Sequence, residues 1–175
     1  MAPPPALSAS PDTPADGCFA DAPLIAADVA RGVSRLLFRH DLFAMCEVPL
    51  ANGRRADLLA IDARGALTII EIKVSRADLR GDMKWPDYLD YCDRFFWAVP
   101  AGFDLAPFEE EGFRPDMAGL IVADRYDAAI VREAAVRPLA APRRRAETLR
   151  FARRAARRLM GGLDPGLGAG LDGAD

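Results

Sequence analysis

Ala66-Leu-Thr-Ile-Ile-Glu-Ile-Lys-Val74 is the stretch that decides the fold of this chain. Its apolar run, rich in β-branched residues, predicts a largely buried β-strand. Two charged residues, Glu71 and Lys73, interrupt the run, and charged side chains are rarely buried unless they are paired. Because side chains alternate along a strand, both project from the same face. Packing alone therefore does not explain why this strand contains Glu71 and Lys73.

This strand completes a predicted antiparallel meander. The two preceding strand candidates and the turns that follow them are Phe43–Pro49, Asn52-Gly53, Ala56–Asp62 and Arg64-Gly65. Both dipeptides have the chemistry of tight turns between strands. A hairpin that turns at Arg64-Gly65 can bring Asp57 beside Glu71 and Lys73. Two carboxylates and one amine are then expected to converge.

The rest of the chain predicts an α/β domain. A helix is expected over Asp21–His40, where apolar residues recur at helical spacing. A capping box at Ser75 begins a helical turn, and Pro86 suits the first turn of a crossover helix that reaches Cys92. Later strands are expected over Phe95–Pro100, Ala118–Ala123 and Ala128–Ala134, and a last helix over Arg145–Leu159. This order predicts a central mixed β-sheet, an antiparallel hairpin meander plus a crossover helix, flanked by helices.

Composition divides the chain into four segments. Residues 1–20, rich in Pro and Ala, cannot bury enough apolar surface to offset ordering entropy and are expected to form a flexible tail. Residues 21–140 hold the domain, residues 141–160 an Arg-rich helix packed on it, and residues 161–175 a Gly-rich flexible tail. Widely spaced Cys18, Cys46 and Cys92 are expected to be reduced thiols. Without a signal peptide or an apolar run of roughly 18 residues, the protein is expected to be cytoplasmic, with no membrane partner.

Basic residues gather in the last predicted helix. Segment 141–160 contains eight Arg and one Glu, although the whole chain has a net charge of −3. The apolar stripe expected to pack on the domain consists of Leu149, Ala152, Ala156 and Leu159. The arginines expected to face away are Arg150, Arg153, Arg154, Arg157 and Arg158. They could contact DNA phosphates, form a solvated face or bind an acidic partner.

The converging residues have the chemistry of a metal-dependent phosphodiesterase. Asp57 and Glu71 offer oxygen ligands for Mg²⁺ or Mn²⁺, and Lys73 can position a metal-activated water and stabilise developing charge. Glu47, on the adjacent strand, could add a metal ligand or be a solvated strand residue. The plainer alternative for Glu71 and Lys73 is an ordinary ion pair on a half-exposed strand. Lys73 and Lys84 are the only lysines among 23 basic residues, which supports a special role.

Four motifs resemble those of the MmcB-type DNA repair proteins. They are Glu47-Val-Pro-Leu50, Gly53-Arg-Arg-Ala-Asp57, Glu71-Ile-Lys-Val-Ser75 and Asp82-Met-Lys-Trp-Pro-Asp-Tyr88, within a similarity that runs from about Asp21 to Arg132. The resemblance implies a restriction endonuclease-like core and a bacterial role in tolerance of DNA damage such as crosslinks. By position, Asp57, Glu71 and Lys73 match the PD-(D/E)xK signature, with Ala56 in place of its proline.

DNA contacts are expected around this site. Lys84, Tyr88 and Tyr91 share one face of the predicted crossover helix and could meet phosphate, or they could pack the helix on the sheet. We favour phosphate contact for Lys84 and leave Tyr88 open. Further expected contacts are Arg54, Arg55, Arg150, Arg153, Arg154 and Arg157.

The sequence thus predicts a Mg²⁺-dependent DNA endonuclease that acts in repair, associated with the nucleoid. One alternative is a catalytically silent DNA-binding or adaptor module recruited with other repair proteins. Another is a regulator that docks through its arginine helix on an acidic protein. A homodimer is expected only by analogy with other nucleases of this superfamily, because no heptad or exposed apolar patch in the sequence establishes one.

Overall fold

The computed structural model describes residues 24–81, 84–164 and 166 of the chain. The predicted tail over residues 1–20, Cys18 and residues 167–175 of the predicted C-terminal tail lie outside the described residues. The elements in chain order are α1 (Ala26–Arg39), β1 (Leu42–Pro49), β2 (Arg55–Asp62), β3 (Leu67–Ile72), α2 (Arg76–Gly81), the 3₁₀ turn η1 (Trp85–Tyr88), β4 (Arg94–Pro100), the 3₁₀ turns η2 (Ala106–Glu109) and η3 (Glu111–Phe113), β5 (Gly119–Ala123), β6 (Ala128–Arg132) and α3 (Ala141–Leu163).

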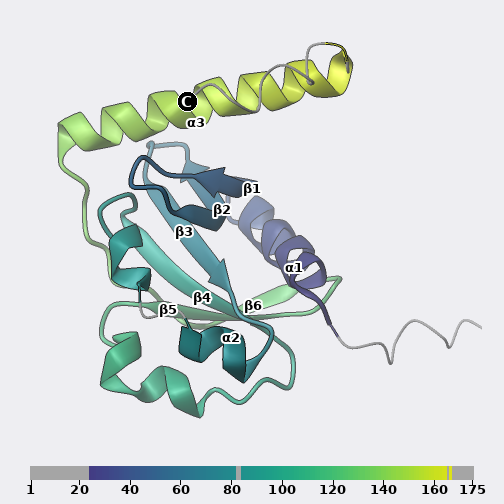
Figure 1. The fold of residues 1–175 in the computed structure, drawn as a ribbon, viewed down its shortest axis with the longest axis vertical. Helices are drawn as coiled ribbons and strands as arrows, with labels where there is room; N and C mark the ends of the chain where they lie inside the picture. Colours follow the sequence, from purple (N-terminus) through teal and green to yellow (C-terminus); the bar gives the residue numbers. More distant parts are fainter. Residues whose placement is uncertain (1–23, 82–83, 165, 167–175) are drawn as a thin grey trace, which may run out of the picture.

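The strands form one mixed sheet whose order is that of the chain, from β1 to β6 (Figure 1). β1, β2 and β3 make the predicted antiparallel meander, and its turns place Gly53 at φ +79° and Gly65 at φ +78°, a conformation that glycine adopts readily. A crossover then makes β4 parallel to β3, β5 lies parallel to β4, and β6 is antiparallel to β5. The predicted α/β class is confirmed, and the arrangement is consistent with a restriction endonuclease-like core.

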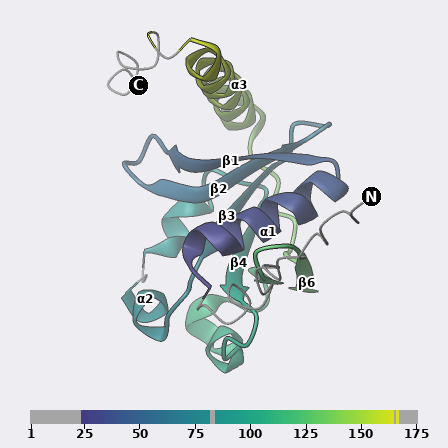
Figure 2. The same cartoon turned by 90° about the vertical axis from the view of Figure 1, so that its right-hand side faces the viewer.

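The sheet separates two apolar clusters. On one face, α1 runs across the strands (Figure 2) and buries Val29, Val33, Leu36 and Leu37. The other face carries an aromatic cluster that includes Trp85, Tyr88, Phe95, Trp97 and Phe108. β3 lies between the two clusters with every residue buried. The prediction of a buried central strand is therefore confirmed.

α1 is fixed against the turn between β5 and β6. A Cβ atom at Gly32 would lie 2.1 Å from the carbonyl oxygen of Asp124, so a larger residue has no room there. Two turns further on, Arg39 forms an ion pair with Asp127 at 2.5 Å. The helix therefore has one well-defined position on the sheet.

The crossover differs from the prediction after its first turn. The N–H of Asp78 donates to the Ser75 hydroxyl at 3.1 Å, as expected of a helix start, and α2 follows. The predicted helix from Pro86 to Cys92 is wrong, because the chain forms only the short turn η1. Trp85, Tyr88 and Tyr91, spaced three residues apart, are all buried. This spacing matches the three residues per turn of a 3₁₀ helix.

α3 is longer than predicted and turned about its axis. It runs through Gly161 and Gly162 to Leu163, so these glycines do not end the helix. The predicted packing stripe faces solvent, with Leu149 61% and Leu159 66% exposed, whereas Phe151 and Glu147 are buried. The expected orientation is therefore wrong.

Contacts with the edge strand β1 explain this orientation. Arg154 donates to the carbonyl oxygen of Pro49 and Arg158 to that of Glu47, each at 3.1 Å. Carbonyl groups on an edge strand need such partners, and the Phe151 ring buries more apolar area than a leucine. Two arginines that were expected to face away from the domain therefore face it.

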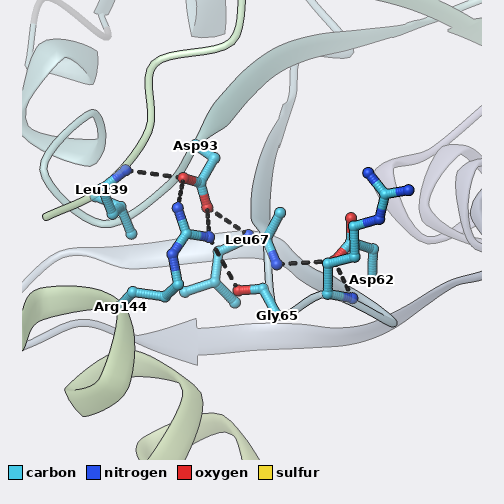
Figure 3. A network of polar contacts seen from close by, with 8 residues as sticks. Asp62, Gly65, Leu67, Asp93, Leu139 and Arg144 are labelled. Atoms are coloured by element: carbon cyan, nitrogen blue, oxygen red, sulfur yellow. Dashed lines mark hydrogen bonds and ion pairs between the residues drawn. The ribbon is translucent and has the colours of Figure 1, made fainter. Parts of the chain in front are cut away.

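Asp93, just before β4, joins three parts of the chain (Figure 3). Its carboxylate accepts hydrogen bonds from the N–H groups of Leu67 and Leu139, both at 2.8 Å. Arg144 of α3 donates to both carboxylate oxygens at 2.8 and 2.5 Å, and also to the carbonyl oxygen of Gly65 at 3.2 Å. This bidentate pair anchors α3 to the β2–β3 turn.

Candidate active site

β2 and β3 separate at Asp57. Their paired residues end at Leu58 and Ile70, and side chains supply the next hydrogen bonds. The Asp57 carboxylate accepts from the N–H of Ile72 at 2.7 Å. The N–H of Asp57 in turn donates to Oε1 of Glu71 at 3.2 Å. The fork between the strands therefore orients both carboxylates.

Glu71 and Lys73 lie beneath the aromatic face of the sheet. They are 3% and 6% exposed, and Nζ of Lys73 is 3.6 Å from Oε2 of Glu71. The Lys73 ammonium also lies 5.6 Å from the centroid of the Trp97 ring, a distance at which the ring attracts a cation. The structure thus brings Asp57, Glu71 and Lys73 together. A half-exposed surface pair, the plainer alternative, is wrong because both side chains are buried.

Asp57 faces a hollow on the side of the sheet that α1 covers. The hollow has a volume of about 370 Å³, and its lining includes Asp57, Cys46, Ile72, Arg31 and Ser34. Burial raises the pKa of the Asp57 carboxyl above its usual value of 3.8, although the hydrogen bond from Ile72 and the charge of Lys73 lower it. The carboxylate is therefore ionised at a cost.

The two carboxylates have the donor chemistry that a divalent cation prefers. Mg²⁺ is commonly held by one or two carboxylates together with water and substrate phosphate. Asp57 and Glu71, on adjacent strands and joined by one hydrogen bond, supply two such groups. A bound cation would also offset the cost of ionising the partly buried Asp57. The residues present therefore suit Mg²⁺ or Mn²⁺.

Glu47 lies at an irregularity of β1. Its φ is +52°, and the β1–β2 register skips the pair formed by Glu47 and Asp57. Its Oε2 lies 2.5 Å from Nε of Arg55, and its side chain is 54% exposed. Within the described residues, no three or more Asp, Glu, His or Cys side chains are grouped so as to hold a metal. The structure favours a solvated strand residue over a third ligand.

The expected DNA contacts near the site are scattered. Tyr88, which the sequence left open, is 6% exposed and donates its hydroxyl to the carbonyl oxygen of Arg55 at 3.1 Å, so it packs in the core. Arg54 pairs with Asp87 at 2.8 Å. Lys84 is exposed just before η1. Of the expected DNA contacts near the site, Arg54, Arg55 and Lys84 lie at the surface.

The predicted DNA contacts on α3 fall into two groups, arginines that bind other parts of the protein and arginines that do not all reach the surface equally. Arg150 pairs with Glu147 at 2.5 Å, and Arg154 is directed at β1. Arg153 is exposed and Arg157 is partly buried. The arginine helix therefore presents only part of its charge to solvent.

Arg31 and Ser34 of α1 were missed as neighbours of Asp57. The four-residue spacing of Arg31, Arg35 and Arg39 gives this helix a basic face, but spacing alone does not show that its first turns line the hollow. The described cysteines, Cys46 and Cys92, are free thiols as expected. Burial raises the pKa of Cys92 to about 12, which makes it unreactive.

The model of a protein family described as "DNA repair protein MmcB-like" matches residues 12–166 of the chain. The chain belongs to the MmcB-like family of DNA repair proteins. This confirms the resemblance predicted from the motifs and gives the protein a role in DNA repair. No helix in the described ranges has both the length and the apolar character to cross a bilayer.

A solved structure similar to this MmcB-like chain is the SPO1766 protein of unknown function from Silicibacter pomeroyi. The two are 43% identical and superpose with a TM-score of 0.70. The match covers 78% of this chain and 90% of that chain. No match was found among curated proteins.

Proposed function

We propose that this MmcB-like protein is a metal-dependent DNA phosphodiesterase of the PD-(D/E)xK type. The convergence of Asp57, Glu71 and Lys73 where β2 and β3 separate carries the proposal. Burying an ion pair on an apolar strand does little for stability, and such groups gather where chemistry requires them. The repair role of the family supports DNA as the substrate class.

Each residue has a distinct part in hydrolysis. When bound, Mg²⁺ supplies a Lewis acid and lowers the pKa of a coordinated water. Asp57 and Glu71 offer it ligands whose orientation is set by backbone N–H groups. Lys73, held beside Glu71, provides positive charge close to where negative charge develops on the phosphate. Arg31 can hold the DNA backbone at the hollow beside Asp57.

A second candidate is a DNA-binding or adaptor module without catalysis. The burial of Glu71 and Lys73, at 3% and 6% exposure, favours it, because a catalytic amine must approach water and substrate. In that function the pair would only be a part of the fold. DNA binding is common to both candidates, so cleavage separates them.

The test is cleavage of labelled duplex, forked, single-stranded and crosslinked DNA with Mg²⁺ or Mn²⁺. We expect the wild type to cleave at least one substrate. Glu71→Gln and Lys73→Met should each lower the rate at least about 100-fold, because each removes a group that acts on the transition state. Binding of the same DNA is followed by fluorescence anisotropy. Binding without cleavage of any substrate would assign the adaptor function instead.

Asp116→Asn is the matched control, since Asp116 is an exposed carboxylate that pairs with Arg114 outside the site. It should cleave at the wild-type rate. A contaminating nuclease would give the same rate in Glu71→Gln and Lys73→Met as in the wild type. Thermal denaturation of each variant verifies that a lost activity does not come from unfolding.

A further inference from the structure

A stripe of apolar side chains on α3 faces away from the domain. Leu149 is 61%, Leu159 66% and Leu163 78% exposed. Ala152 and Ala156, between the leucines, are also exposed. Single exposed leucines are common on protein surfaces, but three on one helix face form a contiguous patch.

The spacing of the stripe is that of a coiled-coil seam, so the expectation that the sequence holds no heptad pattern is wrong for this helix. Positions 149, 152, 156, 159 and 163 follow one another at intervals of three and four residues. This alternation places side chains along the line where two helices meet. The small alanines in the middle allow close approach, and the leucines fill the ends. A helix that lies in a membrane surface presents a wider apolar face, commonly with Trp or Phe.

The opposite face of α3 is already engaged. Phe151 and Glu147 are buried, and Arg154 and Arg158 donate to carbonyl oxygens of β1. Arg144 holds the first turns of the helix to Asp93. Figure 1 shows α3 along one edge of the molecule, beyond β1. A second helix can therefore lie along the seam without displacing any of these contacts.

Positive charge beside the seam determines which kind of partner helix can pair with α3. Arg153 and Arg157 follow seam positions directly on one side, and Arg145 stands one turn before Leu149. The segment 141–160 holds eight Arg and one Glu. A second copy of α3 would set this positive charge against itself, which opposes pairing, whereas acidic side chains would complement it.

We infer that α3 is the docking site for an acidic amphipathic helix of a partner protein. Its apolar side chains pack along the leucine and alanine seam, and its carboxylates face the exposed Arg153. This inference is independent of the proposed nuclease activity, because no seam residue lies at the fork between β2 and β3.

The test uses the full chain and a synthetic peptide of three heptads with leucine at the seam positions and glutamate beside them. A matched peptide carries lysine in place of glutamate. By fluorescence anisotropy, the glutamate peptide should bind at least tenfold more tightly than the lysine peptide. The double variant L149Q/L159Q should weaken its binding at least tenfold, and Arg153→Gln should weaken it less. Val136→Gln, at a residue 57% exposed elsewhere, should leave it unchanged.

Other outcomes would overturn the inference. Equal binding of the two peptides, or no binding of either, would exclude an acidic helix as the partner of α3. A concentration-dependent dimer in sedimentation that L149Q/L159Q dissociates would assign the seam to a second copy. If the wild type binds phosphatidylglycerol vesicles and L149Q/L159Q does not, the seam would be assigned to a lipid surface. The same result with duplex DNA would assign the seam to nucleic acid.

Discussion

Asp93 and Glu71 are two carboxylates with equal burial and different surroundings. Each is 3% exposed. Contacts of Asp93 with two backbone N–H groups and one guanidinium measure 2.5 to 2.8 Å. Two contacts of Glu71, with the backbone N–H of Asp57 and with Nζ of Lys73, are longer, at 3.2 and 3.6 Å. Burial alone therefore does not identify a functional carboxylate, and the geometry of its partners separates the structural Asp93 from the candidate site residue.

The largest effect on stability is expected from Asp93→Ala. It leaves the Arg144 guanidinium and the N–H groups of Leu67 and Leu139 without their acceptor, which should lower the free energy of unfolding by about 4 kcal/mol. Denaturation with urea measures this loss. Asp116→Asn, at an exposed ion pair, should leave the midpoint unchanged. A loss below about 1 kcal/mol in Asp93→Ala would mean that the network contributes little.

Removing both charges of the Asp93 network should also destabilise the protein, but less. D93N/R144M leaves no unpaired charge, yet one amide oxygen must serve the N–H groups of Leu67 and Leu139, and the Gly65 carbonyl loses its donor. We expect a loss of about 2 kcal/mol. A variant as stable as the wild type in urea would show that the network is replaceable by apolar packing.

The same double replacement at the candidate site should have the opposite sign. E71Q/K73M removes a buried pair whose desolvation cost its attraction hardly offsets, so stability should stay constant or rise by about 1 kcal/mol. Cleavage should nevertheless be abolished. Urea denaturation and the DNA cleavage assay are run on the same preparation. A strong loss of stability would place Glu71 and Lys73 in the same structural class as Asp93.

The smallest effect is expected from Asp57→Asn and depends on pH. Burial raises the folded-state pKa of Asp57 above 3.8. The folded protein thus binds the proton more tightly, and this contribution to stability is present below 3.8 and lost as the pH rises through the raised pKa. Asp57→Asn should therefore melt at a higher temperature than the wild type at pH 7, and the difference should vanish as the pH approaches 3.8. A difference in melting temperature that stays constant between pH 3.8 and pH 7 would contradict a raised pKa of Asp57 in the folded protein.

Local patterns in the sequence predicted most of the sheet and the candidate site. The apolar run around Glu71, the turn at Arg64-Gly65 and the helical period of α1 are short-range signals, and the structure follows them. The convergence of Asp57 with Glu71 and Lys73 followed from strand alternation and the position of one turn. Such relations need no knowledge of the remaining chain.

Features that depend on distant contacts were not predictable. The orientation of α3 rests on Phe151 and on carbonyl groups of the edge strand β1, which no helical projection contains. The depth of the Glu71 and Lys73 pair depends on Trp97, which lies on another strand. Asp93 attracted no notice because its partners follow no local period.

The Asp93 network also orders the events of folding. Its partners Leu67, Leu139 and Arg144 lie 26, 46 and 51 residues away along the chain. Contacts over such separations form slowly, because the entropy of closing the loops opposes them, whereas the meander pairs neighbouring segments. During synthesis, β1, β2 and β3 can pair while the last helix is still inside the ribosome. The Asp93 network closes only after Arg144 has emerged.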